Sequence, residues 1–132
     1  MNNKCMISTN QNNKLHQDAI VLGNSKKLWK FKKLPNPHAK DNYKLMLTEY
    51  LGDDSVVVIP KSINGHEVTQ IGRNVFYRNE NITGVIIPDS ITNIGVFRKN
   101  IEIPAFAFFD CAGLTIIKIP ATVIKIGEWS FF

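Results

Sequence analysis

Cysteine is scarce in this chain, and the few residues that could bind a metal are far apart. The two cysteines, Cys5 and Cys111, have no histidine close to them in the sequence. The three histidines, His16, His38 and His66, show no metal-ligand spacing. Because disulfide scaffolds and zinc sites need several closely placed ligands, we expect neither here, and we expect no metal.

Long apolar segments are also lacking. No apolar run approaches the roughly 18 residues that a membrane-crossing helix requires. The polar N-terminus is not followed by the apolar segment of a secretory signal. We therefore expect a cytoplasmic protein from the sequence as given, or a cell-surface protein if a leader precedes it.

Catalytic motifs are missing as well. The sequence contains no glycine-rich phosphate loop, no His-Glu-x-x-His and no Gly-x-Ser-x-Gly, and its acidic residues are dispersed. We therefore predict no catalytic residues, no bound cofactor and no enzymatic activity. The 132 residues suffice for one domain.

Positive charge is concentrated in the N-terminal third. Residues 1–49 contain nine lysines and three acids, whereas residues 50–132 contain seven basic and eight acidic residues. The formal net charge of +5 therefore comes from the first segment alone.

What the chain does contain is an internal repeat. The pair Ile-Gly recurs at Ile71-Gly72, Ile94-Gly95 and Ile126-Gly127. The first interval is 23 residues and the second is 32. Since Ile103 lies 23 residues before Ile126, the longer interval indicates an insertion of nine residues near 95–103.

Other positions agree with this register. Phenylalanine follows the anchor isoleucine by five residues at Phe76, Phe108 and Phe131, and Ile-Pro recurs at Ile87-Pro88 and Ile119-Pro120. An earlier Ile59-Pro60 indicates one further coil upstream. A segment of about 23 residues cannot bury an apolar face alone, but stacked copies can share one core.

Within a coil, alternating apolar residues predict short strands. Ile82, Val85 and Ile87 should face inward, as should Leu114, Ile117 and Ile119, and the proline that follows should end each strand. Residues 43–50 alternate too and predict an initial strand.

Turn residues complete the pattern. Asn64-Gly65 predicts a two-residue hairpin turn. Gly72, Gly95 and Gly127 should permit tight bends with positive φ. Residues 73–76 should form a helical turn that places Phe76 in the core.

Residues 43–132 resemble the BspA-type leucine-rich repeat family. The family's coil has the form Leu-x-x-Ile-x-Ile-Pro-x-x-Val-x-x-Ile-Gly-x-x-Ala-Phe-x-x-Cys. Residues 114–131 follow it, with Ser130 in the alanine position, and residues 107–111 match the Ala-Phe-x-x-Cys element. The resemblance implies a mainly β solenoid of about three to four coils with short helical turns. It also implies a binding role, because family members are often surface proteins implicated in adhesion. We therefore divide the chain into a basic N-terminal segment, 1–42, that is partly flexible or capping, and a repeat domain, 43–132.

The repeat register predicts which residues line the exposed strand face. One outward column should contain Val58, Ile86 and Lys118, and its neighbour Val56, Gly84 and Ile116. Such a partly apolar face would dock a partner, or the N-terminal segment would cover it. In the insertion, Phe97, Arg98 and Lys99 would suit an anchor flanked by charge, or the insertion is an idle loop.

Two further segments have alternative interpretations. In residues 26–33, Trp29 and Phe31 alternate with basic residues, which would bind nucleic acid or an anionic surface, unless the two aromatics only seal the first coil. The basic residues of this patch are Lys26, Lys27, Lys30, Lys32 and Lys33. At the other end, Trp129, Phe131 and Phe132 either cap the last coil or pair with another copy as a homodimer.

Together these patterns favour a non-catalytic protein–protein interaction module of adhesin type, which binds through the strand face and the insertion. A small intracellular inhibitor, such as a phage anti-defence factor, is an alternative hypothesis. Electrostatic binding of nucleic acid or acidic surfaces by the basic N-terminal third is another.

Overall fold

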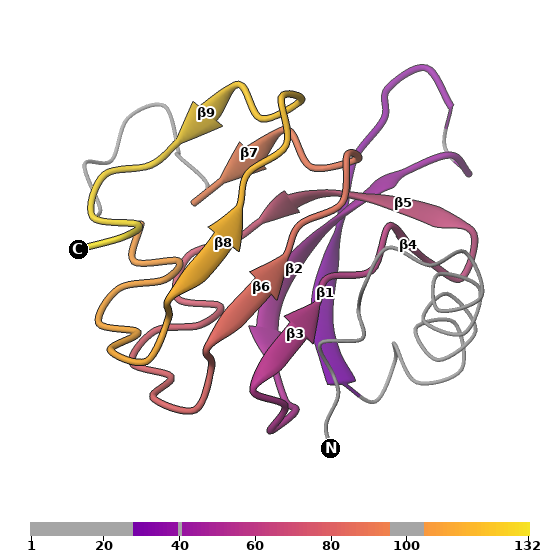
Figure 1. Cartoon of the computed structure of the whole chain (residues 1–132). Helices are drawn as coiled ribbons and strands as arrows, with labels where there is room; N and C mark the ends of the chain where they lie inside the picture. The colour runs from indigo at the N-terminus through magenta and orange to yellow at the C-terminus, as the bar shows by residue number, and fades with distance from the viewer. Residues whose placement is uncertain (1–27, 40, 96–104) are drawn as a thin grey trace.

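The computed structural model describes residues 28–39, 41–95 and 105–132. From Trp29 onward, these residues form nine strands and no helix (Figure 1). The strands are β1 (Trp29–Leu34), β2 (Lys44–Tyr50), β3 (Val56–Val58), β4 (Ser62–Ile63), β5 (His66–Ile71), β6 (Gly84–Ile86), β7 (Asn93–Ile94), β8 (Ile116–Lys118) and β9 (Lys125–Ile126).

Two sheets are built from successive windings of the chain. One sheet has the order β3-β6-β8, and the other has the order β1-β2-β5-β7-β9 with β4 paired to β5. Every pairing between windings is parallel, and Figure 1 shows the windings following one another from the indigo strands to the yellow ones. Ile71 pairs with Ile94, which pairs with Ile126, so the register deduced from the Ile-Gly pairs is confirmed.

The core lies between the two sheets. Ile71, Ile82 and Ile94 are fully buried, as the alternating pattern predicted. The rings of Phe76 and Phe108 stack with centroids 4.8 Å apart, and that of Phe108 stacks on Phe131 at 5.0 Å. Each winding therefore buries its apolar residues against the winding before it and the winding after it.

The last described winding departs from the prediction that its apolar residues face a closed core. Leu114 and Ile117 are only partly buried, and Ile119 is 39% exposed. Within the part of the chain that the structure describes, this winding has a neighbour on one side only, so its inward face is half covered.

The first winding is closed by β1. This strand runs antiparallel to β2, and Trp29 packs on Tyr50 at 4.8 Å and edge-on against Phe76 at 5.9 Å. The predicted strand at residues 43–50 is present as β2, but Leu45 and Met46 are both buried. A register shift between these two residues interrupts the alternation of sides that a regular strand would show.

The Asn64-Gly65 turn joins β4 to β5 as a hairpin, as predicted. Asn64 has φ 55° and Gly65 has φ 81°. Positive φ at both central residues is the requirement of the hairpin turn that Asn-Gly favours.

The prediction of positive φ at the three repeat glycines holds for only one of them. Gly95 alone of the three has positive φ, at 72°. At Gly72 a Cβ atom would lie 2.6 Å from the carbonyl oxygen of Leu47, and at Gly127 it would lie 2.9 Å from that of Gly95. These two positions need glycine because the neighbouring winding approaches too closely for a side chain.

The predicted helical turn at residues 73–76 is wrong. Asn74 and Arg78 have φ of 61° and 56°, which a right-handed helix excludes. The backbone N–H of Phe76 donates to the carbonyl of Ala107 at 2.9 Å, so it bonds to the next winding instead of within its own turn. The segment consists of β-turns, and Phe76 still reaches the core.

We predict that Phe108→Ala lowers the free energy of unfolding by about 3–5 kcal/mol, because Phe108 is 2% exposed and stacks between two other rings. Urea unfolding followed by circular dichroism measures this. Ile124→Ala is the matched control: its side chain is 81% exposed, and it should change stability by less than about 0.5 kcal/mol. Equal losses in both variants would contradict the stacked core.

Candidate functional site

The outer face of β3, β6 and β8 holds the residues that the repeat register singled out. Val58 pairs with Ile86, and Ile86 pairs with Lys118. The side chain of Ile86 is 37% exposed, Val58 is partly exposed, and Lys118 is exposed. The structure thus brings these three side chains into one column across three windings. We call this column and the next one the strand face.

The second column of the strand face runs through Val56, Gly84 and Ile116. Ile116 is 71% exposed. A Cβ at Gly84 would make only ordinary contacts, at 3.7 Å from Val56 Cγ2 and from the carbonyl oxygen of Ile116. Because Gly84 has no side chain, the surface of this column is recessed between the side chains of Val56 and Ile116.

A row of hydroxyl groups borders the strand face. Thr83 Oγ1 donates to the carbonyl of Ser55 at 3.2 Å, and Thr115 Oγ1 donates to the carbonyl of Thr83 at 3.1 Å. Backbone N–H groups of the same threonines donate to the same carbonyls. These bonds hold the edge of the face rigid, so its apolar columns keep a fixed shape.

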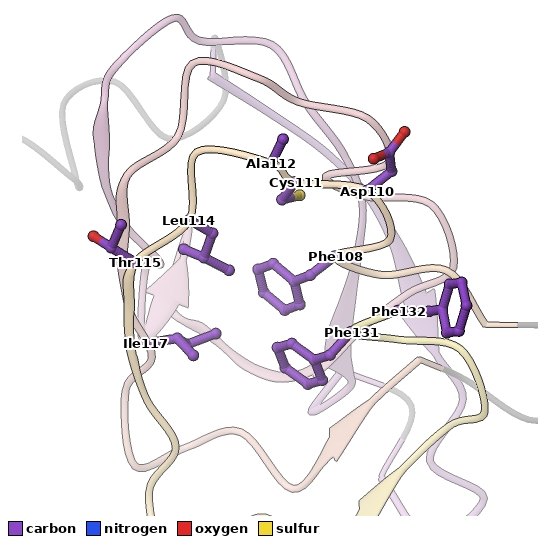
Figure 2. A pocket seen from close by; sticks show the side chains of 9 residues that line it. All are labelled: Phe108, Asp110, Cys111, Ala112, Leu114, Thr115, Ile117, Phe131 and Phe132. Carbon is purple, nitrogen blue, oxygen red and sulfur yellow. The ribbon is translucent and has the colours of Figure 1, made fainter.

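A pocket of about 370 Å³ opens at the last winding (Figure 2). Leu114 and Ile117 point toward Phe108 and Phe131 across it, whereas Phe132 points away (Figure 2). Its lining is completed by Asp110, Cys111, Ala112 and Thr115. The pocket is thus the exposed end of the shared core, and it brings together no set of catalytic groups.

Cys111 lies at this pocket, half-buried beside the core. Its Sγ donates a hydrogen bond to the carbonyl of Phe76, at 3.0 Å. Burial raises the pKa of the Cys111 thiol, and the nearby Asp110 carboxylate adds to this rise. The thiol is therefore held in its protonated, less reactive form.

The described part of the basic segment makes structural contacts. Lys30 forms an ion pair with Glu49 at 2.9 Å, and Lys33 lies over the ring of Tyr43 at 4.5 Å. Lys32 is exposed, and Lys26 and Lys27 lie outside the described residues. Trp29 is 3% exposed and so cannot stack on a base. This geometry supports the interpretation in which the aromatics of the segment seal the first winding.

Two other sequence predictions involve the insertion and the C-terminus. Phe97, Arg98 and Lys99 lie outside the described residues. Trp129 and Phe132 are 47% and 74% exposed, so neither is a buried cap. Phe131 is 41% exposed and stacks on Phe108 with one face.

A cluster of aromatic side chains lies on the turns between the sheets, and of its members the sequence had singled out only Trp129 and Phe132. Tyr77 stacks on Phe109 at 5.6 Å, and Phe109 stacks on Phe132 at 5.7 Å. Phe106 contacts Phe109 edge-on at 4.7 Å, and Trp129 contacts Phe132 at the same distance. We call these five residues the aromatic cluster. An aromatic residue after each core phenylalanine, in Phe76-Tyr77, Phe108-Phe109 and Phe131-Phe132, was the signal that could have revealed it.

The aromatic cluster sits on strained backbone. Phe106 and Trp129 have φ of 29° and 65°, and they occupy, in the two following windings, the position that Asn74 holds with φ 61°. Asparagine tolerates this conformation, whereas for bulky residues it costs about 1–3 kcal/mol. An aromatic pair contributes about 0.5–1.5 kcal/mol. The ring contacts, together with the apolar area that they bury, offset this strain.

Among the described residues, no group of three or more His, Cys, Asp or Glu side chains is arranged to hold a metal ion. No helix in the described part of the chain is long and apolar enough to cross a membrane.

Comparison with protein families gives a match over residues 69–132 to the family described as "BspA type Leucine rich repeat region (6 copies)". The comparison with curated proteins found no match.

Several solved bacterial structures are similar to this chain. A leucine-rich repeat protein of T. pallidum is 27% identical with a TM-score of 0.60, over 76% of this chain and 40% of that one. A leucine-rich cell surface protein of Faecalibacterium prausnitzii is 28% identical with a TM-score of 0.59, over 76% of this chain and 26% of that one. A leucine-rich repeat protein of Bacteroides capillosus is 28% identical with a TM-score of 0.60, over 76% of this chain and 67% of that one. The chain thus spans less than half the length of the first two.

We predict that Cys111 reacts more slowly with iodoacetamide at pH 7.5 than a free cysteine does. The reactive form is the thiolate, and burial raises the pKa, so less thiolate is present near neutral pH and the rate should rise at more alkaline pH. Intact-mass spectrometry of Cys5→Ser follows this one thiol, and the unfolded protein in urea is the control. A folded protein that reacts as fast as the unfolded one would show that the thiol is not protected.

Proposed function

We propose, from the match of residues 69–132 to the BspA-type leucine-rich repeat family, that the chain is a non-catalytic module that binds another protein through its strand face. The observation that carries the proposal is the exposed apolar surface of β8 and its neighbours. Ile86 and Ile116 are exposed on a rigid sheet instead of being buried.

The recognition mechanism is shape and apolar complementarity. Val58, Ile86 and Ile116 offer aliphatic side chains held in columns, and the low point at Gly84 accepts a side chain of the partner. Contiguous exposed apolar surface on a folded protein usually marks an interaction site. Lys118 stands at the end of one column, where a charge at the rim would orient the partner more than strengthen binding.

We infer that the setting of this binding is a cell surface, in the manner of an adhesin. The support is the similarity to the cell surface protein of Faecalibacterium prausnitzii. An inhibitor acting inside a cell is the alternative. Protease treatment of intact cells discriminates between them, because a surface module is degraded under conditions that leave an internal marker protein whole.

We predict that Ile86→Asp and Ile116→Asp each weaken capture of the protein partner by about 2 kcal/mol, because a carboxylate would have to be desolvated inside an apolar contact. The measurement is affinity capture from cell extracts and surface fractions, with mass spectrometry of the captured proteins. Circular dichroism should show an unchanged fold.

Ile124→Asp makes the same chemical change at an exposed residue next to β9, and it should leave capture intact. If recognition is apolar, the amount of captured partner should change little between low and moderate salt. Binding through contacts between basic residues and phosphates would instead weaken steeply as the salt concentration rises. Capture that survives both strand-face variants, or that disappears with moderate salt, would reject the strand face as the binding surface.

A further inference from the structure

We propose that Asn64 is a site of spontaneous covalent modification, at which the side-chain amide is lost and the backbone of the β4–β5 turn rearranges to isoaspartate. The turn consists of Asn64 and Gly65 alone, between the paired residues Ile63 and His66. It belongs to the sheet that contains β5 and not to the sheet of the strand face. The proposal therefore stands apart from the proposed function.

The reaction is an attack of one backbone nitrogen on the side chain that precedes it. The Gly65 nitrogen gives its proton to water or hydroxide and forms a bond to Cγ of Asn64, and the bond from Cγ to Nδ2 breaks. Nδ2 takes up a proton and leaves as ammonia, and the product is a five-membered succinimide ring. The step involves no oxidation or reduction, and solvent water is the one co-reactant.

Water then opens the ring at one of its two carbonyl carbons. If the bond between Cγ and the Gly65 nitrogen breaks, the product is aspartate with the original main chain. If the bond between the backbone carbonyl carbon of residue 64 and that nitrogen breaks, the product is isoaspartate, whose main chain continues through the former side chain. In either case one water is consumed, one ammonia is released and one new carboxylate is formed.

The fold leaves the reacting atoms open. Asn64 and Gly65 are both exposed. Among the described residues, no hydrogen bond involves the Asn64 side-chain amide or the Gly65 N–H. A Cβ atom at Gly65 would meet no other atom within 4 Å. Neither a side chain at residue 65 nor a neighbouring element therefore obstructs the attack or the entry of water.

The conformation of the turn sets the rate. Asn64 has φ 55° and Gly65 has φ 81°. Ring closure requires rotation about the Cα–C bond of Asn64, out of the hairpin conformation, so the turn must open before it reacts. β4 has only two residues, and an exposed hairpin end held by so short a strand opens at a small cost in free energy. The fold thus slows the reaction without preventing it.

Asn74 provides a comparison within the same chain. It is exposed and has φ 61°, close to the value at Asn64. The residue after it is Val75, which is 5% exposed and packs in the core. Its branched side chain crowds the nitrogen that would have to attack. The two asparagines share exposure and backbone φ, so a difference in their rates reports on the residue that follows.

Isoaspartate would disturb the hairpin and the contacts beside it. It adds one main-chain atom to a turn in which two residues close the pair of Ile63 and His66, and a tight two-residue turn has no room for that atom. The His66 ring stacks on Tyr43 with centroids 3.7 Å apart, and Glu67 pairs with Lys44 at 3.1 Å. Displacement of the start of β5 would separate both pairs.

Peptide mapping by mass spectrometry, after incubation of the whole folded protein in mildly alkaline buffer, tests the proposal. Asn64 should lose its amide at least about tenfold faster than Asn74, which corresponds to about 1.4 kcal/mol of activation free energy. Labelling by an isoaspartate methyltransferase should identify isoaspartate at residue 64. The rate should rise with pH, because the attacking nitrogen must be deprotonated. The protein unfolded in guanidinium chloride should react faster, because no turn has to open.

A second measurement separates the new charge from the lengthened main chain. Freshly prepared Asn64→Asp carries the carboxylate on the original main chain, and aspartate tolerates the left-handed conformation. Its His66 proton shifts in NMR, which report the stacking on Tyr43, and its melting temperature should match those of the unmodified protein. The isoaspartyl form, isolated by chromatography, should lose these shifts and melt about 4 °C lower.

The proposal is overturned if Asn64 in the folded protein reacts no faster than Asn74, or if aspartate is its only product. It is also overturned if the isoaspartyl form keeps the His66 shifts and the melting temperature of the unmodified protein. None of these outcomes affects the strand-face proposal, because no strand-face residue is altered.

Discussion

The stacking of Phe76, Phe108 and Phe131 holds successive windings in one register, and the surfaces of the molecule follow from it. The rings lie 4.8 and 5.0 Å apart, close to the spacing of hydrogen-bonded strands. When the core of one winding stands directly over the core of the next, the outward side chains must stand over one another too. Both the strand face and the aromatic cluster are columns created in this way.

The close stacking restricts which residues the windings can use. Gly72 and Gly127 are required because a neighbouring backbone occupies the space of a side chain. The turns take left-handed conformations that direct their N–H groups to the next winding, as Arg78 does toward Phe109 at 2.9 Å. Stability thus comes from contacts between windings, and the turns bear part of the conformational cost.

The first and last windings show what happens where a neighbour is absent or different. β1 closes one end as an antiparallel strand, and Trp29 meets the Phe76 ring edge-on at 5.9 Å, unlike the parallel rings of the later windings. At the other end of the described chain, Leu114, Ile117 and Phe131 surround a pocket at the end of the core. The lysines beside Trp29 engage Glu49 and the Tyr43 ring, which favours a structural role for the basic strand.

The sequence by itself determined the register of the windings, because Ile71, Ile94 and Ile126 recur with a period that only stacked copies satisfy. It identified the core of the inner windings, where Ile71 and Ile94 are buried, but not that of the last described winding, where Ile126 is 44% exposed. It also determined which side chains share the strand face, since the alternation within each strand fixes which residues point outward and the repeat fixes which of them are neighbours. Only the tertiary structure decided that the turns are left-handed instead of helical, because their N–H groups are satisfied by the next winding. It alone placed Tyr77 against Phe109, since a contact between residues 32 apart depends on how the turns pack and on no pattern within one winding.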